Sequence, residues 1–386
     1  MGRSFMPRSK RDPARRPSPE IVLVLQGGGA LGAYQGGVYE TLVAHEHMPA
    51  WVAGTSIGAI NGAIVAGNPP HRRLERLREF WHLVGRDDPL APLAANPLGA
   101  WLQRWFDPVI WDTLMRGIPG FFEPRLNALP DIRRVVPTRE TSFYDTGPLR
   151  RTLEQLVDFD YLNAKHVRLT VCAVDVDTGE QVRFDSHTQR LAPEHIMASG
   201  ALPPGFPPVV IGGKAYWDGG IYSNTPVDVV MDDAERRDML CFMVDLWDPT
   251  EESPRSISEA LMRQKDIQYA SRTREHLDDH RTMQNLRRAV DLLAQRLPPQ
   301  ERDHPLVRRL TGLGCTRSVD IVRLIMKAAP TDDFNKDINF TRAKIAERWQ
   351  AGARDAGRAF RHKSWLTPVP ADVGMVIHEL PQEEKA

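Results

Sequence analysis

The sequence predicts an α/β fold in which a mostly parallel central sheet lies between helices. Three observations predict it: short, wholly apolar runs typical of buried strands, helical segments between the first two runs, and glycine-rich turns where the runs end. We also expect a helical cap over the sheet and a helical C-terminal extension, so that the chain builds one main domain with two additions.

The first strand and helix are predicted near the start of the chain. Residues 21–25 are apolar and mostly branched and stop at glycines, which is typical of a buried parallel strand. A helix should follow from about Gly32, with Val38, Leu42 and Val43 on its inner face.

A second strand is expected at residues 51–53, followed by a sharp glycine turn at 54–58 and a helix of small residues at 59–67. Strand, helix, strand and helix in this order indicate a parallel sheet with right-handed crossovers. Two further strands of the same sheet are predicted at residues 167–176 and 239–247, where apolar runs end in polar residues.

Residues 69–150 lack a sustained period and read as helices and loops forming a cap or lid. They contain most of the notable aromatic residues, namely Trp81, Trp101, Trp105, Trp111, Phe121 and Phe122. These side chains fit either a lipid-contacting surface or a core between cap and sheet. A contiguous exposed apolar patch would favour the lipid surface.

The remaining parts of the chain complete the expected domain division. Residues 1–20 are basic and rich in proline and are expected to be a disordered tail, and residues 21–248 form the main domain. Residues 249–386 are charged and predicted to be helical, because apolar residues recur at helical spacing, as at Leu286, Val290, Leu293, Leu297, Ile345, Trp349, Ala353 and Phe360.

Composition excludes several classes of protein. Lysine plus arginine and aspartate plus glutamate both number 50, so no overall field favours nucleic acid. The three cysteines, Cys172, Cys241 and Cys315, are odd in number and lack C-x-x-C spacing, which argues against disulfides or a zinc site. With no secretory signal and no apolar run of 18 residues, we expect a cytoplasmic protein whose membrane contact, if any, is peripheral.

The pattern Gly27-x-Gly29-x-x-Gly32 raises the possibility of dinucleotide binding. That function needs an acidic residue at the end of the second strand, and none is present. The second strand ends instead in Gly54-x-Ser56-x-Gly58, the pattern of a nucleophile on a tight strand-to-helix turn.

The two glycine turns should lie side by side at the carboxyl edge of the sheet. Gly27, Gly28 and Gly29 would then present backbone N–H groups next to Ser56, which predicts an oxyanion hole. The base for the serine is expected to be Asp218, which follows two aromatic residues and precedes Gly219. Taken alone, D-G-G is also an ordinary turn.

In combination these residues resemble the patatin-like phospholipases, lipid acyl hydrolases with a Ser-Asp dyad. The glycine loop GGGALG (27–32), the turn GTSIG (54–58) and the D-G-G triplet (218–220) occur in the family's order. The stretch ASGALPPGFPPV (198–209) is also similar, so the resemblance covers roughly residues 20–248.

The resemblance implies a sheet-and-helix patatin fold and hydrolysis of fatty-acyl esters of lipids, of phospholipase A or lysophospholipase type, without metal or cofactor. Ser56 would be the nucleophile, Asp218 the base, and the amides of Gly27 to Gly29 the oxyanion hole. The supporting glycines of the matching motifs are Gly32, Gly54, Gly58, Gly219 and Gly220. Leu31 departs from the family's frequent basic residue, so the resemblance does not extend to a preference for phosphate-bearing headgroups.

Four alternatives stay open from the residues. A Ser-His-Asp triad could use His195 and Asp175, although His195 more simply packs or caps a helix. His276 and His280 stand four apart as metal ligands would, but their charged surroundings indicate a solvated helix face. The protein could also be a non-catalytic binding or scaffold protein with this fold, or an esterase that acts on non-phospholipid esters.

Overall fold

The computed structural model describes residues 18–87, 108–125, 133–233, 237–270 and 273–380. Its main sheet has nine strands, in the order β11-β10-β9-β1-β2-β5-β8-β7, with β6 also paired to β5. All pairs from β11 to β5 are parallel, and β6, β7 and β8 pair antiparallel. The strands are β1 (Glu20–Leu25), β2 (Trp51–Thr55), β5 (Arg168–Asp175), β6 (Gln181–Asp185), β7 (Val209–Ile211), β8 (Lys214–Asp218), β9 (Met239–Asp245), β10 (Val319–Ile325) and β11 (Met375–Glu379).

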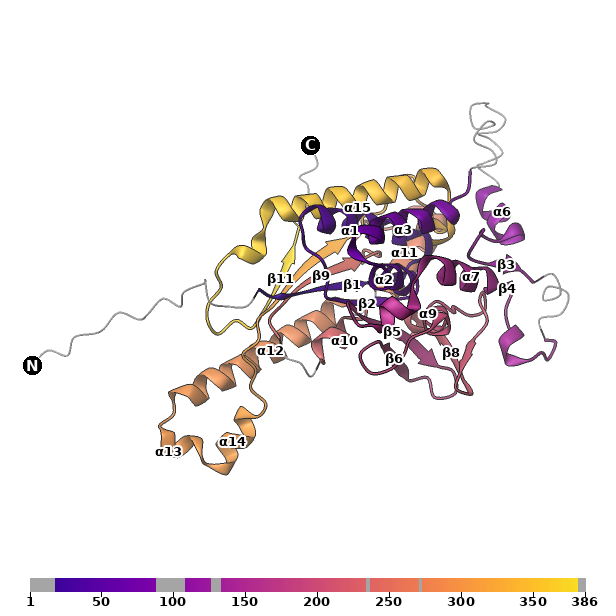
Figure 1. Cartoon of the computed structure of the whole chain (residues 1–386). Coiled ribbons are helices and arrows are strands. Elements are labelled where there is room, and N and C mark those ends of the chain that lie inside the picture. The colour runs from indigo at the N-terminus through magenta and orange to yellow at the C-terminus, as the bar shows by residue number, and fades with distance from the viewer. Residues whose placement is uncertain (1–17, 88–107, 126–132, 234–236, 271–272, 381–386) are drawn as a thin grey trace, which may run out of the picture.

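Helices cover both faces of this sheet, which confirms the predicted fold class (Figure 1). The helices are α1 (Ala33–Ala44), α2 (Ile57–Ala66), α3 (Pro70–Leu83), α6 (Pro108–Arg116), α7 (Gly147–Leu156), α8 (Phe159–Asn163), α9 (Pro193–Ser199), α10 (Val227–Met231), α11 (Ile257–Ala270), α12 (Thr273–Arg296), α13 (Pro299–Arg302), α14 (Pro305–Thr311) and α15 (Arg342–His362). The short elements are the 3-10 helices η2 (Gly29–Gly32), η3 (Thr138–Glu140), η4 (Gly219–Ile221), η5 (Lys336–Ile338) and η6 (Ser364–Leu366), and a hairpin of β3 (Glu123–Pro124) with β4 (Tyr144–Asp145).

The first strand shows how the sheet divides the core. Leu23 and Leu25 face one cluster, which contains residues of α1, α2, α3 and α15. Val22 and Val24 face a second cluster with α10 and α12. Because successive side chains of a strand point to opposite faces, a wholly apolar run is what a strand buried on both sides requires. The four strands that the sequence predicts are therefore present as β1, β2, β5 and β9.

Two strands meet end to end along one edge of β5. Strand β6 pairs with residues 170–174 of β5. Strand β2 pairs with residues 168–172 of β5 and β8 with residues 173–175, so each of them shares β5 residues with β6. A strand residue has one neighbour on each edge, so β2 and β8 both lie on the edge opposite β6. The last residue of β2, Thr55, is opposite Cys172, and the last residue of β8, Asp218, is opposite Ala173. The carboxyl ends of these two strands thus converge.

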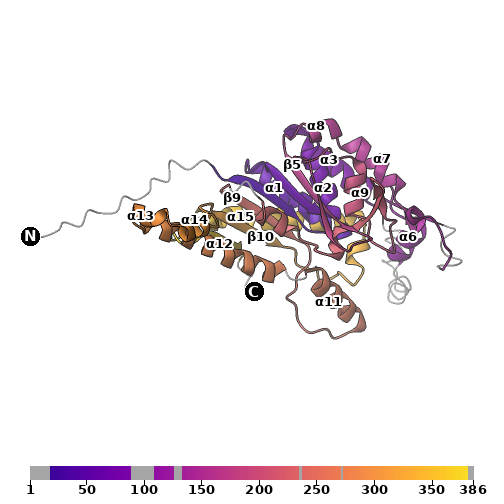
Figure 2. The same ribbon diagram turned by 90° about the horizontal axis from the view of Figure 1, so that it is seen from below.

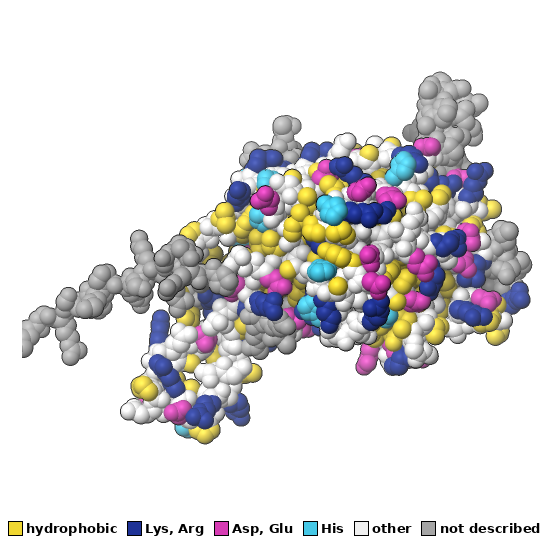
Figure 3. Space-filling model, in the orientation of Figure 1, with side chains coloured by type: hydrophobic (Ala, Val, Ile, Leu, Met, Phe, Trp, Pro, Cys, Tyr) yellow, Lys and Arg dark blue, Asp and Glu magenta, His cyan; other side chains and the backbone are white. Residues whose placement is uncertain are grey.

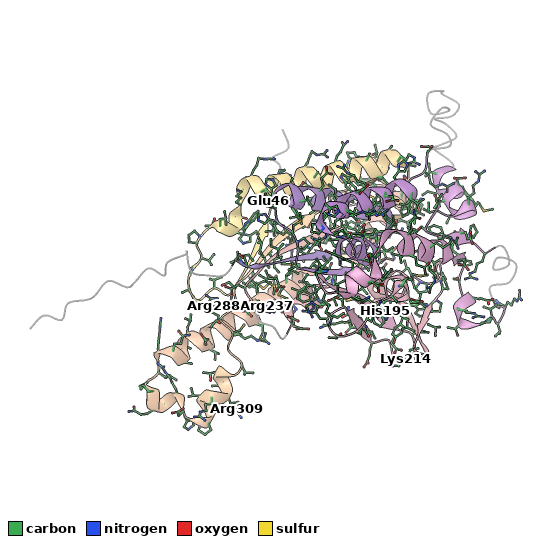
Figure 4. The ribbon with its side chains drawn as sticks, in the orientation of Figure 1. Glu46, His195, Lys214, Arg237, Arg288 and Arg309 are labelled. Carbon is green, nitrogen blue, oxygen red and sulfur yellow. The ribbon has the colours of Figure 1, made fainter. Side chains whose placement is uncertain are left out.

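The region after residue 248 contains the expected long helices, and it also contains strands. β10 and β11 extend the main sheet beyond β9 in parallel register. The sequence predicts helices alone here, so the prediction is wrong for the segments that form β10 and β11. In Figures 1 and 2, the later part of α12 leads away from the body and forms an arm with α13 and α14, and Arg309 lies on this arm (Figure 4).

Helix α15 of this region packs closely on α1. A side chain at Gly37 would begin 1.8 Å from the carbonyl oxygen of Trp349, and one at Gly352 would begin 2.0 Å from that of Tyr34. Glycine at both positions allows the two backbones to approach this closely. The division at residue 248 stays a prediction, but the contacts join the two parts through one core.

The predicted N-terminal tail falls largely on residues 1–17, which lie outside the described residues, and Glu20 already begins β1. No helix in the described ranges is long and apolar enough to cross a bilayer. Figure 3 shows acidic and basic side chains interspersed over one face of the molecule, in keeping with the equal numbers of the two kinds of charge.

Candidate active site

Ser56 occupies the turn between β2 and α2 in a strained backbone conformation, with φ 55° and ψ −123°. Two glycines make this turn possible, because a side chain at Gly54 would begin 2.4 Å from the Gly58 carbonyl oxygen. One at Gly58 would begin 2.3 Å from the carbonyl oxygen of Leu25, at the end of β1. Positive φ at a non-glycine residue is uncommon and clusters at functional sites. The Ser56 backbone N–H donates to both the carbonyl and the hydroxyl oxygen of Ser199, each at 3.1 Å.

Asp218 ends β8 and is buried, with 2% of its surface exposed. Its Oδ1 accepts a hydrogen bond of 2.7 Å from the Gly220 N–H, and the Ser56 hydroxyl lies within hydrogen-bonding reach of the same carboxyl group. Burial raises the pKa of Asp218 from 3.8 to about 7, against the opposing effect of these two donors. A carboxylate is thus held against the hydroxyl of Ser56 with a pKa near neutrality.

The glycine loop is anchored at its first residue. The Gly27 N–H donates to the carbonyl oxygen of Asn224 at 3.1 Å. The Gly27 carbonyl oxygen accepts from Trp247 Nε1 at 2.8 Å and from Asn224 Nδ2 at 3.0 Å. The Gly27 N–H is therefore already hydrogen-bonded within the protein. Of the three N–H groups predicted to form the oxyanion hole, those of Gly28 and Gly29 are left for a ligand.

Those two donors are the N–H groups of Gly28 and Gly29. Neither has an acceptor among the described residues. Gly29 has φ +53° and begins η2, which runs directly into α1, so both amides lie at the positive end of a helical segment. Both residues line the same cavity as Ser56. The arrangement offers two backbone donors to an oxyanion formed at Ser56.

The cavity above Ser56 has a volume of about 300 Å³. Its lining is mostly apolar and aromatic, with contributions from the cap and from the region after residue 248: Ile57, Ile60, Thr113, Leu114, Phe121, Phe122, Tyr144, Gly200, Leu202, Pro203, Pro204, Gly205, Phe206, Trp247, Tyr269, Ile338 and Phe340. The lining in the described ranges contains two carboxylates, Asp218 and Asp337, and no lysine, arginine or histidine. Such a cavity suits an apolar chain better than an anion.

One wall of the cavity comes from residues that sequence reasoning missed. Tyr269 lies near the end of α11, and Asp337 and Phe340 lie on and just after η5. The carbonyl oxygen of Asp337 sits so close to the glycine loop that a side chain at Gly29 would begin 2.3 Å away. No motif marks these residues, because their role depends on the folding of a distant segment onto the loop.

The cap tryptophans divide between core and surface. Trp81 is buried and donates through its Nε1 to Asn61 at 3.1 Å, and Phe121 and Phe122 are also buried. Trp111 on α6 is 49% exposed. Trp101 and Trp105 lie outside the described residues. The interpretation as a core between cap and sheet therefore holds for Trp81.

The histidines considered as alternatives lie elsewhere. His195, labelled in Figure 4, accepts a hydrogen bond from the Ala192 N–H at 3.0 Å at the start of α9. It is not among the described residues that line the cavity. Asp175, its possible partner, pairs with Lys214 at 3.2 Å. His276 and His280 both contact Asp228, at 3.3 and 2.8 Å, and so join α12 to α10. They are partly buried in this contact and do not form a fully solvated face.

Comparison with known proteins gives the family. A family model described as patatin-like phospholipase matches residues 23–231, more than half of the 386 residues, and a second, described as patatin phospholipase, matches 267–372. No curated protein matches the chain.

Two solved structures resemble the chain at low identity. VipD from Legionella pneumophila is 14% identical, with a TM-score of 0.36, over 89% of this chain and 67% of that one. ExoU from the type III secretion system of Pseudomonas aeruginosa, solved with SpcU, is 15% identical, with a TM-score of 0.30, over 93% and 76%. At these values nothing that the two proteins do carries over to this chain. On the two family matches, the chain belongs to the patatin-like phospholipase family.

Proposed function

We propose that the protein is a serine acyl hydrolase that cleaves fatty-acyl ester bonds of lipids through a Ser56–Asp218 dyad. The observation that carries the proposal is the placement of the Ser56 hydroxyl and the buried Asp218 carboxyl group in one cavity, within hydrogen-bonding reach of each other. This pair opens into an apolar cavity beside two backbone N–H groups without protein acceptors in the described ranges. A nucleophile, its base and oxyanion donors are the groups that acyl transfer requires.

The first step forms the acyl-enzyme. Ser56 Oγ attacks the ester carbonyl carbon while its proton passes to Asp218. The carbonyl oxygen becomes negatively charged and accepts hydrogen bonds from Gly28 and Gly29, at the positive end of η2. The bond from carbon to the leaving oxygen then breaks, and that oxygen takes the proton from Asp218.

The second step repeats this sequence with water. Water gives a proton to Asp218, attacks the acyl carbon, and displaces Ser56 Oγ, which recovers the proton. The products are a fatty acid and the alcohol. An ordinary aspartate is a weak base toward a hydroxyl, and the raised pKa of Asp218 makes it a stronger one.

The lining of the cavity bears on the substrate. Its aromatic and aliphatic side chains would bury the acyl chain of a lipid in apolar surroundings, away from water. The described lining offers no cation to a phosphate group, and Leu31 is fully buried where the family often has a basic residue. We therefore place neutral acyl esters, such as glycerides, ahead of anionic phospholipids as substrates.

The test compares wild type with Ser56→Ala on emulsified neutral glyceride and on phospholipid vesicles, with release of fatty acid as the readout. We expect the substitution to reduce hydrolysis to the background rate, since it removes the nucleophile, while circular dichroism stays unchanged. Hydrolysis retained by a folded Ser56→Ala variant would refute the proposal.

A further inference from the structure

We propose that Tyr269 is a further catalytic residue, whose phenol hydroxyl donates a hydrogen bond to the leaving oxygen of the ester. This inference rests on the proposed function of the Ser56–Asp218 dyad. Tyr269 lines the cavity, although it belongs to α11, which lies after the glycine loop, the serine turn and the D-G-G triplet in the sequence.

The backbone of Tyr269 is fixed to the glycine loop. Its carbonyl oxygen accepts hydrogen bonds from Gln26 Nε2 and from Asn224 Nδ2, both at 3.2 Å. Asn224 uses the same nitrogen to donate to the carbonyl oxygen of Gly27 at 3.0 Å. A displacement of Tyr269 would therefore disturb the loop that carries the oxyanion donors.

The ring of Tyr269 is fixed as well. It packs on Trp247, with ring centroids 4.9 Å apart and planes inclined by 31°. Trp247 Nε1 itself donates to the Gly27 carbonyl oxygen at 2.8 Å. The phenol hydroxyl, by contrast, has no hydrogen-bond partner within the described part of the chain. A rigidly held donor without a protein partner in the described ranges, in the cavity that Ser56 and Asp218 also line, is available to a ligand.

Two ion pairs hold this part of α11 in place. Lys265 binds Asp337 at 2.8 Å, and Asp266 binds Lys336 at 2.5 Å. Each element carries a lysine followed by an aspartate, and each lysine pairs with the aspartate of the other element. The two pairs together fix the register of α11 and η5. Asp266 and Lys336 are buried, which makes a loss of either partner costly.

Electrostatics keep the phenol protonated. Burial raises the pKa of Tyr269 above 10.0, and the nearby carboxylates of Asp337 and Asp218 raise it further, because they disfavour a phenolate. Tyr269 therefore remains a donor over the working pH range.

The role follows from this placement. As the bond to the leaving oxygen breaks, negative charge develops on that oxygen before the Asp218 proton arrives. The Tyr269 hydroxyl stabilises this charge by hydrogen bonding and keeps its own proton, so the proton balance between Ser56, Asp218 and the alcohol is unchanged. The benefit is greatest for alkoxide leaving groups, which are strongly basic, and small for nitrophenolate, which needs little stabilisation.

The experiment measures kcat/KM of Tyr269→Phe with two esters of one fatty acid, a glycerol ester and a p-nitrophenyl ester. We expect a loss of about 10- to 100-fold with the glycerol ester and less than about 3-fold with the p-nitrophenyl ester. Phenylalanine keeps the ring contact with Trp247. The matched control is Tyr222→Phe, because Tyr222 is 64% exposed and is not among the described residues that line the cavity. Both rates should remain at the wild-type values.

The outcomes separate the possible failures. Equal losses with both esters would indicate a structural role for Tyr269, and no loss with the glycerol ester would remove the residue from the mechanism; either result overturns the inference. If Ser56→Ala retained hydrolysis, the dyad itself would be wrong. A fluorophosphonate provides a further check, because its fluoride leaving group needs no protonation, and Tyr269→Phe should react with it at close to the wild-type rate.

Discussion

In the proposed mechanism Asp218 acts as the base without a histidine, and its environment explains how an aspartate could do so. Its carboxyl group is buried, and among the described residues the donors that favour its charged form are the Gly220 N–H and the Ser56 hydroxyl. Burial disfavours the charged form more than the two donors favour it, so the pKa of Asp218 rises to about 7. Asp218 is therefore the residue that should set the pH dependence of the reaction.

We expect kcat/KM to rise with pH through a midpoint near 7, because Asp218 must be deprotonated to accept the Ser56 proton. Below the midpoint the rate should fall about 10-fold per pH unit, so the value at pH 5 should be roughly 100-fold below that at pH 8. The measurement is a pH profile with a soluble ester. A profile that stays flat from pH 5 to pH 8 would show that Asp218 keeps an ordinary pKa.

At the scale of elements, the site depends on how strands and loops meet. The sequence is sufficient to predict the turn at Ser56, because Gly54 and Gly58 flank it, and to predict Asp218 from its motif. The sequence does not show that β2 and β8 end head to head on one edge of β5, which brings the two residues together. That arrangement follows from β6 occupying the other edge, and β6 has no distinctive pattern.

The contact between the glycine loop and η5 is the element-level feature that we expect to be most sensitive. In Gly29→Ala the added methyl group would meet the Asp337 carbonyl oxygen, and the residue already has φ +53°. The loop would have to shift, and with it the two oxyanion donors. We expect kcat to fall about 10- to 100-fold, measured with a soluble ester.

Gly179→Ala is the matched control for this substitution. Gly179 also has a positive φ, of +72°, but a side chain there would meet nothing within 4 Å. We expect Gly179→Ala to lower the free energy of unfolding by about 1 kcal/mol through backbone strain. It should leave kcat unchanged. Equal losses of kcat in the two variants would mean that strain, and not the contact with η5, explains the effect at Gly29.

At the scale of the whole molecule, the region after residue 248 helps to line the cavity that contains Ser56 and Asp218. The sequence predicts its helices, because apolar residues recur at helical spacing, as at Ile345 and Phe360. It does not reveal β10 and β11, nor that Tyr269, Asp337 and Phe340 close the cavity, since these contacts join segments far apart in the chain. Local patterns encode elements, whereas the cavity wall depends on tertiary packing.

The most direct test of the account is reaction of the whole protein with a fluorophosphonate at pH 8, read by intact mass and peptide mapping. We predict one adduct per chain in the wild type, located on Ser56, none in Ser56→Ala, and strongly slowed reaction in Asp218→Asn, which has lost its base. An adduct on another residue, or a folded wild-type protein that does not react, would contradict the claim that Ser56 and Asp218 form a working dyad.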